Sequence, residues 1–268
     1  MQLSLTTKTM FIPFIMAGDP HPDITVDLAL ALQEAGADVL ELGVPYSDPL
    51  ADGPIIQRAA SRALKHKMNL PKAIELVPVL RKKGVKIPII LFTYYNPVLQ
   101  LGEEFFFTLV KENGVDGVLI PDLPFEESGP IRKLSAEAGV ACISLVAPTS
   151  KQRIEKIASS AQGFLYCVSS LGVTGVRDTL PDELESFLME VKQYSRVPVA
   201  VGFGISTSEQ VSMLKNYSDG IIIGSALVQK MEQLGDRLLH EETKQEALNE
   251  FQRYAQMLTA SLGKRCTP

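Results

Sequence analysis

The stretch EAGADVLELGVPYSDPLADGP, residues 34–54, carries the pattern that decides the fold. Gly36 follows a segment with helical spacing, and it suits a helix C-cap because glycine adopts a positive φ without a Cβ penalty. A short apolar run follows at residues 38–44, and then a loop rich in proline and aspartate. This order of helix end, strand and loop is typical of a βα unit in a parallel sheet.

The same pattern recurs along the chain. The segments ENGVDGVLI (residues 112–120) and EAGVACISL (residues 137–145) again place a glycine, Gly114 or Gly139, just before an apolar run. These runs are apolar throughout, as expected when helices cover both sides of a sheet or surround a barrel. The pattern predicts eight strands, at residues 11–18, 38–44, 87–95, 116–122, 141–147, 163–169, 197–203 and 219–225.

The eight βα units follow one another without a linker or a low-complexity segment. We therefore expect one domain over residues 1–268, an α/β fold with a single (β/α)8 (TIM) barrel, because such barrels run to about 250 residues. An open, doubly wound sheet is the alternative, since periodicity does not show closure. Two extended loops are predicted, one after strand 2 from Pro45 to about Leu70 and one after strand 6 in SSLGVTGVRDTLPDE (residues 169–183).

Composition limits the possible functions. Hydrophobic residues make up 46% of the chain and charged residues 21%, and the net charge is -5. This charge argues against nucleic acid as a partner, because phosphate backbones are bound by clustered Lys and Arg. The N-terminal segment has no signal-peptide pattern, and no run approaches the roughly 20 apolar residues of a membrane-spanning helix. We expect a cytoplasmic protein.

Neither the cysteines nor the histidines predict a metal site. The cysteines are far apart in the sequence and form no CxxC motif, so we expect small buried side chains in a reducing compartment. The histidines share no ligand or triad spacing and are expected at the surface. The residues concerned are Cys142, Cys167, Cys266, His21, His66 and His240.

Two carboxylates are the candidate catalytic residues. Glu41 lies inside an apolar strand, where a buried charge is costly unless it is paired or functional. If Leu40 and Leu42 face the helices, Glu41 points into the barrel. Asp52 follows in the loop above the same mouth, and acid-base chemistry needs groups held in different environments. The alternative readings are a Glu41 neutralised by a basic residue and an Asp52 that only forms a turn.

Glycine-rich segments after the last three strands predict a phosphate site. They are SSLGVTG (residues 169–175), GFGIST (residues 202–207) and IIIGSALV (residues 221–228), the last entering a helix near Ser225. Glycine lets backbone amides approach a phosphate, and a helix N-terminus adds donors with the favourable end of its dipole. Barrels commonly bind phosphate after strands 7 and 8.

These motifs resemble the tryptophan synthase α chain family. The resemblance rests on ELGVPYSDPLADGP (residues 41–54), FIPFIMAGDP (11–20), YYNP (94–97), IPDLPFEES (120–128), LVAPTS (145–150), SSLGVTG, VGFGIS (201–206) and GSALV (224–228). It extends from Phe11 to the final helix. It implies a lyase that cleaves indole-3-glycerol phosphate by a retro-aldol reaction, with Glu41 as the acid-base and Asp52 assisting at the indole ring.

The resemblance also implies the remaining site residues. Backbone groups of Gly175, Gly204, Gly224 and Ser225 would hold the phosphate, and Thr174 on a mobile lid would orient Asp52. The indole pocket would be lined by Phe14, Phe92, Tyr94, Leu119, Tyr166 and Phe203.

A partner is implied as well. In the family, the chain docks on a β chain that carries pyridoxal phosphate, forming an α2β2 heterotetramer, and this chain would need no cofactor or metal of its own. The docking face would include Pro45, Asp48, Pro49, Asn96, Asp122 and Pro124. The alternatives are another phosphate-binding barrel enzyme such as a sugar-phosphate isomerase, a free-standing lyase, and a non-catalytic barrel that activates a partner.

Overall fold

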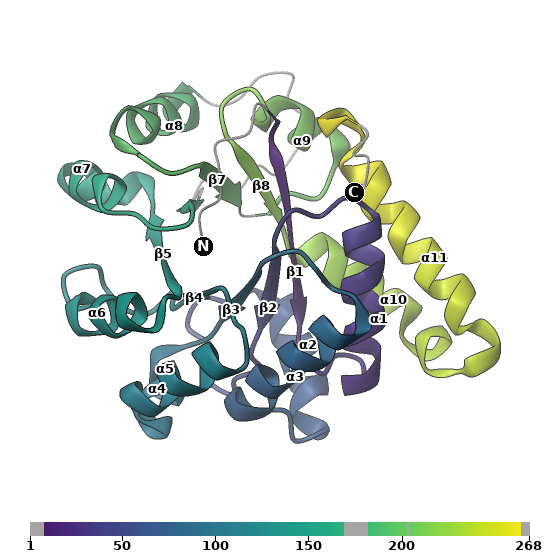
Figure 1. Cartoon of the computed structure of the whole chain (residues 1–268). Helices are drawn as coiled ribbons and strands as arrows, with labels where there is room; N and C mark the ends of the chain where they lie inside the picture. The colour runs from purple at the N-terminus through teal and green to yellow at the C-terminus, as the bar shows by residue number, and fades with distance from the viewer. Residues whose placement is uncertain (1–7, 169–181, 203, 264–268) are drawn as a thin grey trace.

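The computed structural model describes residues 8–168, 182–202 and 204–263. Within these ranges, eight parallel strands close into a barrel in sequence order, with β8 paired to β1 (Figure 1). The strands are β1 (Met10–Met16), β2 (Leu40–Gly43), β3 (Ile89–Phe92), β4 (Gly117–Leu119), β5 (Ala141–Val146), β6 (Leu165–Val168), β7 (Val199–Gly202) and β8 (Gly220–Ile223). Closure confirms the barrel and rejects the open sheet.

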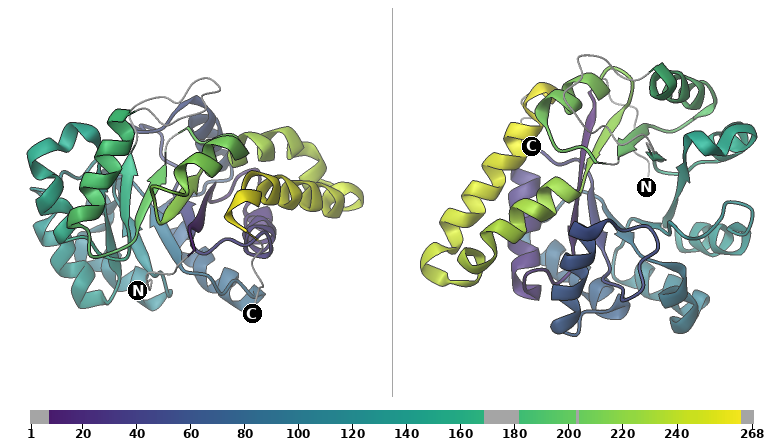
Figure 2. Two further views of the ribbon diagram at one scale, coloured as in Figure 1. Left: turned by 90° about the horizontal axis from the view of Figure 1, so that it is seen from above. Right: turned by 180° about the vertical axis from the view of Figure 1, so that it is seen from behind.

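The helices form a ring outside the strands, as the further views in Figure 2 also show. Those described are α1 (Pro22–Glu34), α2 (Pro54–Lys65), α3 (Leu70–Lys83), α4 (Tyr95–Leu101), α5 (Glu103–Glu112), α6 (Gly129–Ala138), α7 (Ile154–Ser159), α8 (Asp182–Tyr194), α9 (Ser208–Leu214), α10 (Ser225–Leu239) and α11 (Glu241–Leu258). Two 3-10 turns, η1 (Pro148–Arg153) and η2 (Ala260–Leu262), complete the set.

Alternation along β2 sorts its side chains between two cores. Leu40 and Leu42 belong to the outer core, which packs the strands against the helices. Glu41 lies between them, in register with Phe14 of β1 and Ile90 of β3. A separate apolar cluster that includes Ile90, Phe164 and Ile222 fills the barrel interior. Because successive side chains of a strand point to opposite faces, Glu41 faces inward, as the pattern predicts.

Most strands are shorter than the apolar runs that predict them. The fourth run was expected at 116–122, but β4 ends at Leu119. Pro121 has no backbone N–H to donate to a neighbouring strand, and the side chain of Asp122 bonds to the start of α4. The Asp122 carboxylate accepts a hydrogen bond from the backbone N–H of Tyr95 at 2.9 Å. Tyr95 itself begins α4, so the third run, expected to extend to this residue, ends as a strand at Phe92.

The extended segment after β2 is partly helical, which corrects the expectation of a loop up to about Leu70. The loop proper covers residues 44–53, and α2 follows with Pro54 at its first position. Proline suits this position because its missing N–H would be unpaired there anyway. The buried face of α2 consists of Ile56, Ala59, Ala60 and Ala63. Of the second predicted loop, at residues 169–183, the part up to residue 181 lies outside the described residues, and Asp182 and Glu183 begin α8.

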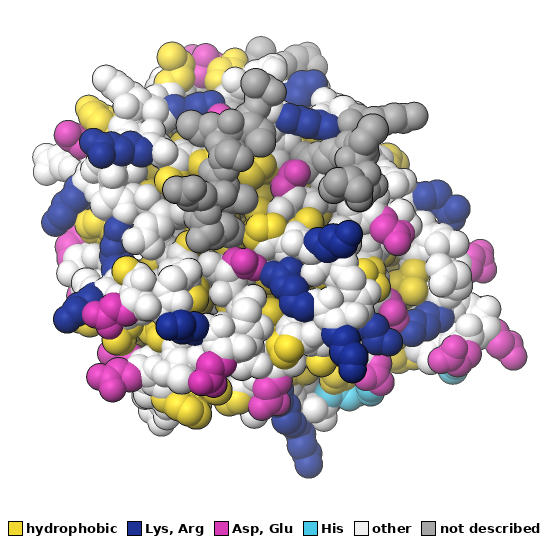
Figure 3. Space-filling view, viewed as in Figure 1, with side chains coloured by type: hydrophobic (Ala, Val, Ile, Leu, Met, Phe, Trp, Pro, Cys, Tyr) yellow, Lys and Arg dark blue, Asp and Glu magenta, His cyan; other side chains and the backbone are white. Residues whose placement is uncertain are grey.

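The exterior of the molecule carries the charged side chains that the composition leads us to expect. On the face shown in Figure 3, the basic and acidic side chains of the described residues are intermingled. The C-terminal helix α11 packs on the barrel exterior against α10 and α1 (Figure 1). Cys142 and Cys167 are buried free thiols, as expected, and Cys266 lies beyond the described residues. None of the described helices is long and apolar enough to cross a membrane.

Candidate active site

A cavity of about 760 Å³ opens at the carboxyl ends of the strands. Its wall includes side chains from β1, β2, β3, β5, β6 and β8, from the loop after β2 and from the start of α10. Eight of the residues predicted from the sequence come together here. They are Phe14, Glu41, Asp52, Phe92, Tyr166, Gly204, Gly224 and Ser225.

Glu41 is the buried acid of this cavity. Its side chain is 1% exposed, and its Oε1 atom has no hydrogen-bond partner among the described residues. Burial without a counter-charge disfavours the ionised form and raises the pKa of Glu41 to about 8. The neutralised-ion-pair reading therefore does not hold, and Glu41 carries a proton at neutral pH. A carboxyl group in this state can donate a proton to a bound molecule.

Asp52 occupies a wetter position on the loop between β2 and α2. It is half-buried, and burial raises its pKa while a hydrogen bond with the Tyr94 hydroxyl lowers it. The same hydroxyl accepts the backbone N–H of Ala51 at 3.1 Å. Tyr94 is 2% exposed and lies two residues after β3, as the N-cap of α4, and it therefore holds the loop that carries Asp52 in place. The two carboxylates stand in different environments within one cavity.

Two glycines make room for the aromatic rings on the wall. A Cβ atom at Gly43 would lie 2.4 Å from Cζ of Phe14, and one at Gly202 would lie 2.6 Å from the hydroxyl of Tyr166. Phe14 in turn meets Phe92 edge to face, with ring centroids 5.6 Å apart. The rings give the cavity an apolar side that suits a flat aromatic ligand.

The wall of the cavity also has backbone groups of glycines and a helix N-terminus. Gly204 adopts a φ of 69°, a conformation that favours glycine. Gly224 is the N-cap of α10, which begins at Ser225 and runs for 15 residues. The first amides of a helix have no partner within it, and the helix dipole favours an anion at that end. This arrangement can bind a phosphate group.

The chain matches a known protein family over nearly its whole length. A sequence model described as "Tryptophan synthase alpha chain" matches residues 1–261. The chain belongs to this family.

Similar proteins agree with this assignment. The tryptophan synthase alpha chain of Geobacillus sp. (strain WCH70) is 77% identical over 262 residues, covering 98% of this chain and 100% of the relative. That of Bacillus subtilis subsp. natto is 58% identical and covers 93% of each chain. Among solved structures, a tryptophan synthase a2b2 complex from Pyrococcus furiosus matches with a TM-score of 0.85 at 36% identity, covering 94% of this chain and 98% of that one.

Some residues expected from the family resemblance lie elsewhere. Tyr94 and Leu119 were predicted to line the indole pocket, but neither is on the cavity wall. Tyr94 holds the Asp52 loop instead, and Leu119 is fully buried in the barrel interior. The lid residue Thr174, the phosphate residue Gly175 and the pocket residue Phe203 lie outside the described residues.

Sequence reasoning missed part of the wall after β5. Leu145 near the end of β5 and Thr149 and Arg153 of η1 line the cavity, together with the exposed Leu50 of the loop after β2. The signal was available, because the LVAPTS motif follows a strand and all barrel strands end at the same face. Arg153 also places a cation at the rim, held by Glu126 at 3.3 Å.

The residues predicted for a docking face differ in exposure. Three of them, Asp48, Asn96 and Pro124, are exposed, whereas Pro49 and Asp122 are half-buried. Pro45 is buried and presents no surface in the chain alone. Among the described residues, no group of three or more His, Cys, Asp or Glu side chains could hold a metal ion. His21 and His66 do meet, with ring centroids 4.8 Å apart, although they share no sequence motif.

Proposed function

We propose that this chain is a lyase that cleaves indole-3-glycerol phosphate into indole and glyceraldehyde 3-phosphate. The observation that carries the proposal is Glu41, a buried carboxyl with an unpartnered oxygen inside a cavity whose wall carries both aromatic rings and a helix N-terminus. Membership of the tryptophan synthase alpha chain family supports the choice of substrate.

Glu41 moves protons twice in the proposed reaction. It first donates its proton to C3 of the indole ring, which makes the ring an electron acceptor. The bond from C3 to the glycerol carbon then breaks, and its electron pair returns to the ring while the Glu41 carboxylate takes the proton of the adjacent hydroxyl. Indole and an aldehyde result, and Glu41 ends in its starting state. A pKa near 8 keeps the acid loaded at neutral pH.

Asp52 and the phosphate site hold the two ends of the substrate. In the proposal, Asp52 in its ionised form accepts the indole N–H and stabilises the positive charge that builds on the protonated ring. Backbone amides at Gly204, Gly224 and Ser225 bind the phosphate, together with Gly175. The rings of Phe14, Phe92 and Tyr166, together with Phe203, enclose the indole.

We further propose that the chain acts in the cytoplasm with a β chain in an α2β2 assembly. The similar structure from Pyrococcus furiosus is of such a complex. The proposed docking face comprises Pro45, Asp48, Pro49, Asn96, Asp122 and Pro124, and the exposed Leu50 and Leu99 lie on the same segments. Pyridoxal phosphate would belong to the β chain, so this chain would bring no cofactor.

Replacing Glu41 with Gln tests the reaction. Glu41→Gln keeps the size of the side chain but cannot give up a proton, so turnover should fall by about a thousandfold or more, while binding of inorganic phosphate stays within twofold of the unmodified chain. Indole release is measured from indole-3-glycerol phosphate, with and without added β chain. Retained turnover would reject Glu41 as the acid-base. Equal rates of indole release by the unmodified chain with and without the β chain would favour a free-standing lyase.

The pH dependence gives a second test. Because the acid must be protonated before it can act, kcat/KM should decline above a pKa near 8. The decline should approach tenfold per pH unit. A profile that stays flat from pH 7 to pH 10 would contradict the role of Glu41 as the acid.

A further inference from the structure

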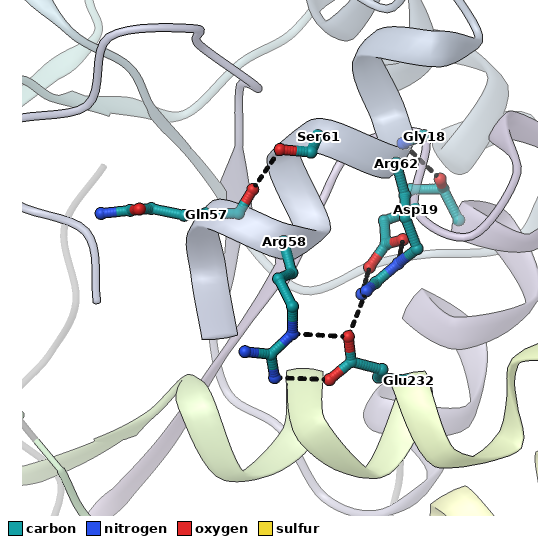
Figure 4. Close-up of polar contacts among 8 residues, drawn as sticks. Gly18, Asp19, Gln57, Arg58, Ser61, Arg62 and Glu232 are labelled. Atoms are coloured by element: carbon teal, nitrogen blue, oxygen red, sulfur yellow. Dashed lines mark hydrogen bonds and ion pairs between the residues drawn. The ribbon is translucent and has the colours of Figure 1, made fainter. Parts of the chain in front are cut away.

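Four charged side chains outside the cavity connect the end of β1 with α2 and α10 (Figure 4). We call them the Arg62 network: Asp19, Arg58, Arg62 and Glu232. Arg62 donates from Nε and Nη2 to the two carboxylate oxygens of Asp19, at 2.6 and 2.9 Å. Its Nη1 donates to Glu232, which also accepts from Nε and Nη2 of Arg58 at 2.9 and 2.7 Å. One carboxylate of α10 is therefore held by two arginines of α2.

Both helices that the network joins, α2 and α10, begin next to the cavity. Asp52 lies two residues before α2, and its backbone carbonyl accepts a hydrogen bond at 2.7 Å from Gln57 in the first turns of that helix. Glu232 lies two helical turns after Ser225, where α10 meets the cavity. The network thus ties the segment that carries Asp52 to the helix whose N-terminus is the proposed phosphate site.

The paired hydrogen bonds of the Arg62 network restrain the orientation of the side chains as well as the distance between them. Paired hydrogen bonds between arginine and carboxylate fix the planes of both groups. Asp19 is fully buried, and the Arg62 and Glu232 side chains are only 26% and 28% exposed, so solvent screens these contacts weakly. The two arginines also hold the pKa of Glu232 at about 2, which keeps its charge at all working pH values.

The start of α2 has little other polar support. Its N-cap is Gly53, which provides no side-chain hydrogen bond, and its first turn has no acidic residue to interact with the helix dipole. The direction of the helix therefore depends on its small apolar face and on the Arg62 network.

We propose that Arg62 and Glu232 are positioning residues that hold α2 against α10, so that Asp52 stands at a fixed place relative to the phosphate of the bound substrate. Neither side chain lines the cavity, so neither contacts the substrate. The inference rests on the proposed function, because it assigns Asp52 and the phosphate site to one reaction.

The first variant is Glu232→Gln in the full chain, assayed with the β chain present. Gln keeps the shape of the side chain but removes the charge that both arginines share. A loosened α2 moves Asp52 but leaves the amides at the start of α10 in place. We expect kcat to fall by about tenfold, because small displacements of a catalytic group are costly. The dissociation constant for inorganic phosphate should stay within twofold.

A double-mutant cycle separates positioning from a general loss of structure. If Glu232 acts through Asp52, adding Glu232→Gln to an Asp52→Asn chain should lower kcat by less than twofold, since the group that it positions is already missing. Independent effects would instead multiply. The matched control is Glu250→Gln, because Glu250 is likewise held by two cations, Lys230 at 2.6 Å and Arg237 at 2.7 Å, but joins α10 to α11. Its kcat should be unchanged.

Hydrogen exchange gives a readout that does not depend on the reaction. The backbone amides of α2 should exchange at least fivefold faster in Glu232→Gln than in the unmodified chain or in Glu250→Gln. Unchanged exchange together with an unchanged kcat, or multiplicative effects in the cycle, would overturn the positioning role while leaving the lyase reaction standing. Faster exchange in a chain that never releases indole would instead reject the proposed reaction and retain the link between the helices.

Discussion

Two carboxylates, Glu41 in β2 and Asp19 just after β1, are buried to nearly the same extent but have opposite surroundings. Asp19 is 0% exposed and Glu41 is 1% exposed. Asp19 receives two hydrogen bonds from Arg62, whereas Oε1 of Glu41 has no partner among the described residues. The strand β1 is therefore followed by a paired acid, and the neighbouring strand β2 contains an unpaired acid.

The difference shows that burial alone does not make a carboxyl group reactive. Desolvation raises the pKa of both groups, but for Asp19 the hydrogen bonds and charge of Arg62 act in the opposite direction. The pKa of Asp19 is still raised, but Asp19 has a counter-charge that favours its ionised form and ties it to α2, whereas Glu41 has none and keeps a proton that it can transfer. The partner, or its absence, separates the structural acid from the candidate catalytic acid.

Removing the partner of Asp19 should have the largest effect on stability. Arg62→Met keeps most of the side-chain volume but leaves a buried carboxylate without its counter-charge. Such changes lower the free energy of unfolding by about 3–5 kcal/mol, which urea unfolding at pH 7 would measure. The loss should shrink as the pH falls toward 4, because the buried Asp19 carboxyl, whose raised pKa rises further without Arg62, then takes up a proton.

The double variant Asp19→Asn with Arg62→Met is the control. It removes both charges together, and most of the lost stability should return because no buried ion is left alone. If the single and double variants are equally unstable, the cost lies in packing and the comparison between the two acids fails.

Glu41→Gln should shift stability in the other direction. The pKa of Glu41 is about 8 in the folded chain against 4.5 when unfolded, so the unfolded chain loses its proton first as the pH rises. The free energy of unfolding of the unmodified chain therefore falls between these two values. Gln has no proton to lose, so the variant should be more stable by up to about 4 kcal/mol at pH 8 and no more stable at pH 4.

Urea unfolding of both chains between pH 4 and pH 9 would test this. The gain should grow through the interval from 4.5 to 8 and then level off. An equal difference at every pH would mean that Gln changes packing and that the folded pKa of Glu41 is not raised.

The fold could be predicted from local signals because each βα unit repeats them. Gly36, Gly114 and Gly139 have φ values of 95°, 72° and 74°, as the predicted helix ends require. The helix α2 was missed because three of its four buried residues are alanines, which give a weak hydrophobic signal, and because Pro54 reads as a loop residue. A signal that recurs in every βα unit can be recognised in a sequence, whereas a short helix whose buried face consists mostly of alanine cannot.

The placement of Glu41 could also be predicted, since alternation in a strand fixes which face a side chain takes. The Arg62 network could not. Asp19 and Arg62 are 43 residues apart, and Arg62 and Glu232 are 170 apart, so their meeting depends on how whole helices pack. For the same reason Tyr94 was assigned to the pocket, although its hydroxyl reaches the backbone of Ala51, 43 residues earlier. Sequence patterns identify the acids but not the residues that hold them.

Tyr94→Phe should give the smallest effect and would sharpen the contrast between the two acids of the cavity. The change removes the acceptor of the Ala51 N–H and the hydrogen bond to Asp52, at a cost of about 1 kcal/mol in stability. Because that bond lowers the pKa of Asp52, its loss should raise this pKa and move the acidic limb of the kcat/KM profile to higher pH. The alkaline limb, assigned to Glu41, should stay in place. Tyr95→Phe is the matched control, since the Tyr95 hydroxyl bonds to Glu103 on the outer ring of helices and should leave both limbs unchanged. A Tyr94→Phe profile that matches the control would mean that Asp52 does not need its tyrosine, and the wetter acid would then owe its state to solvent alone.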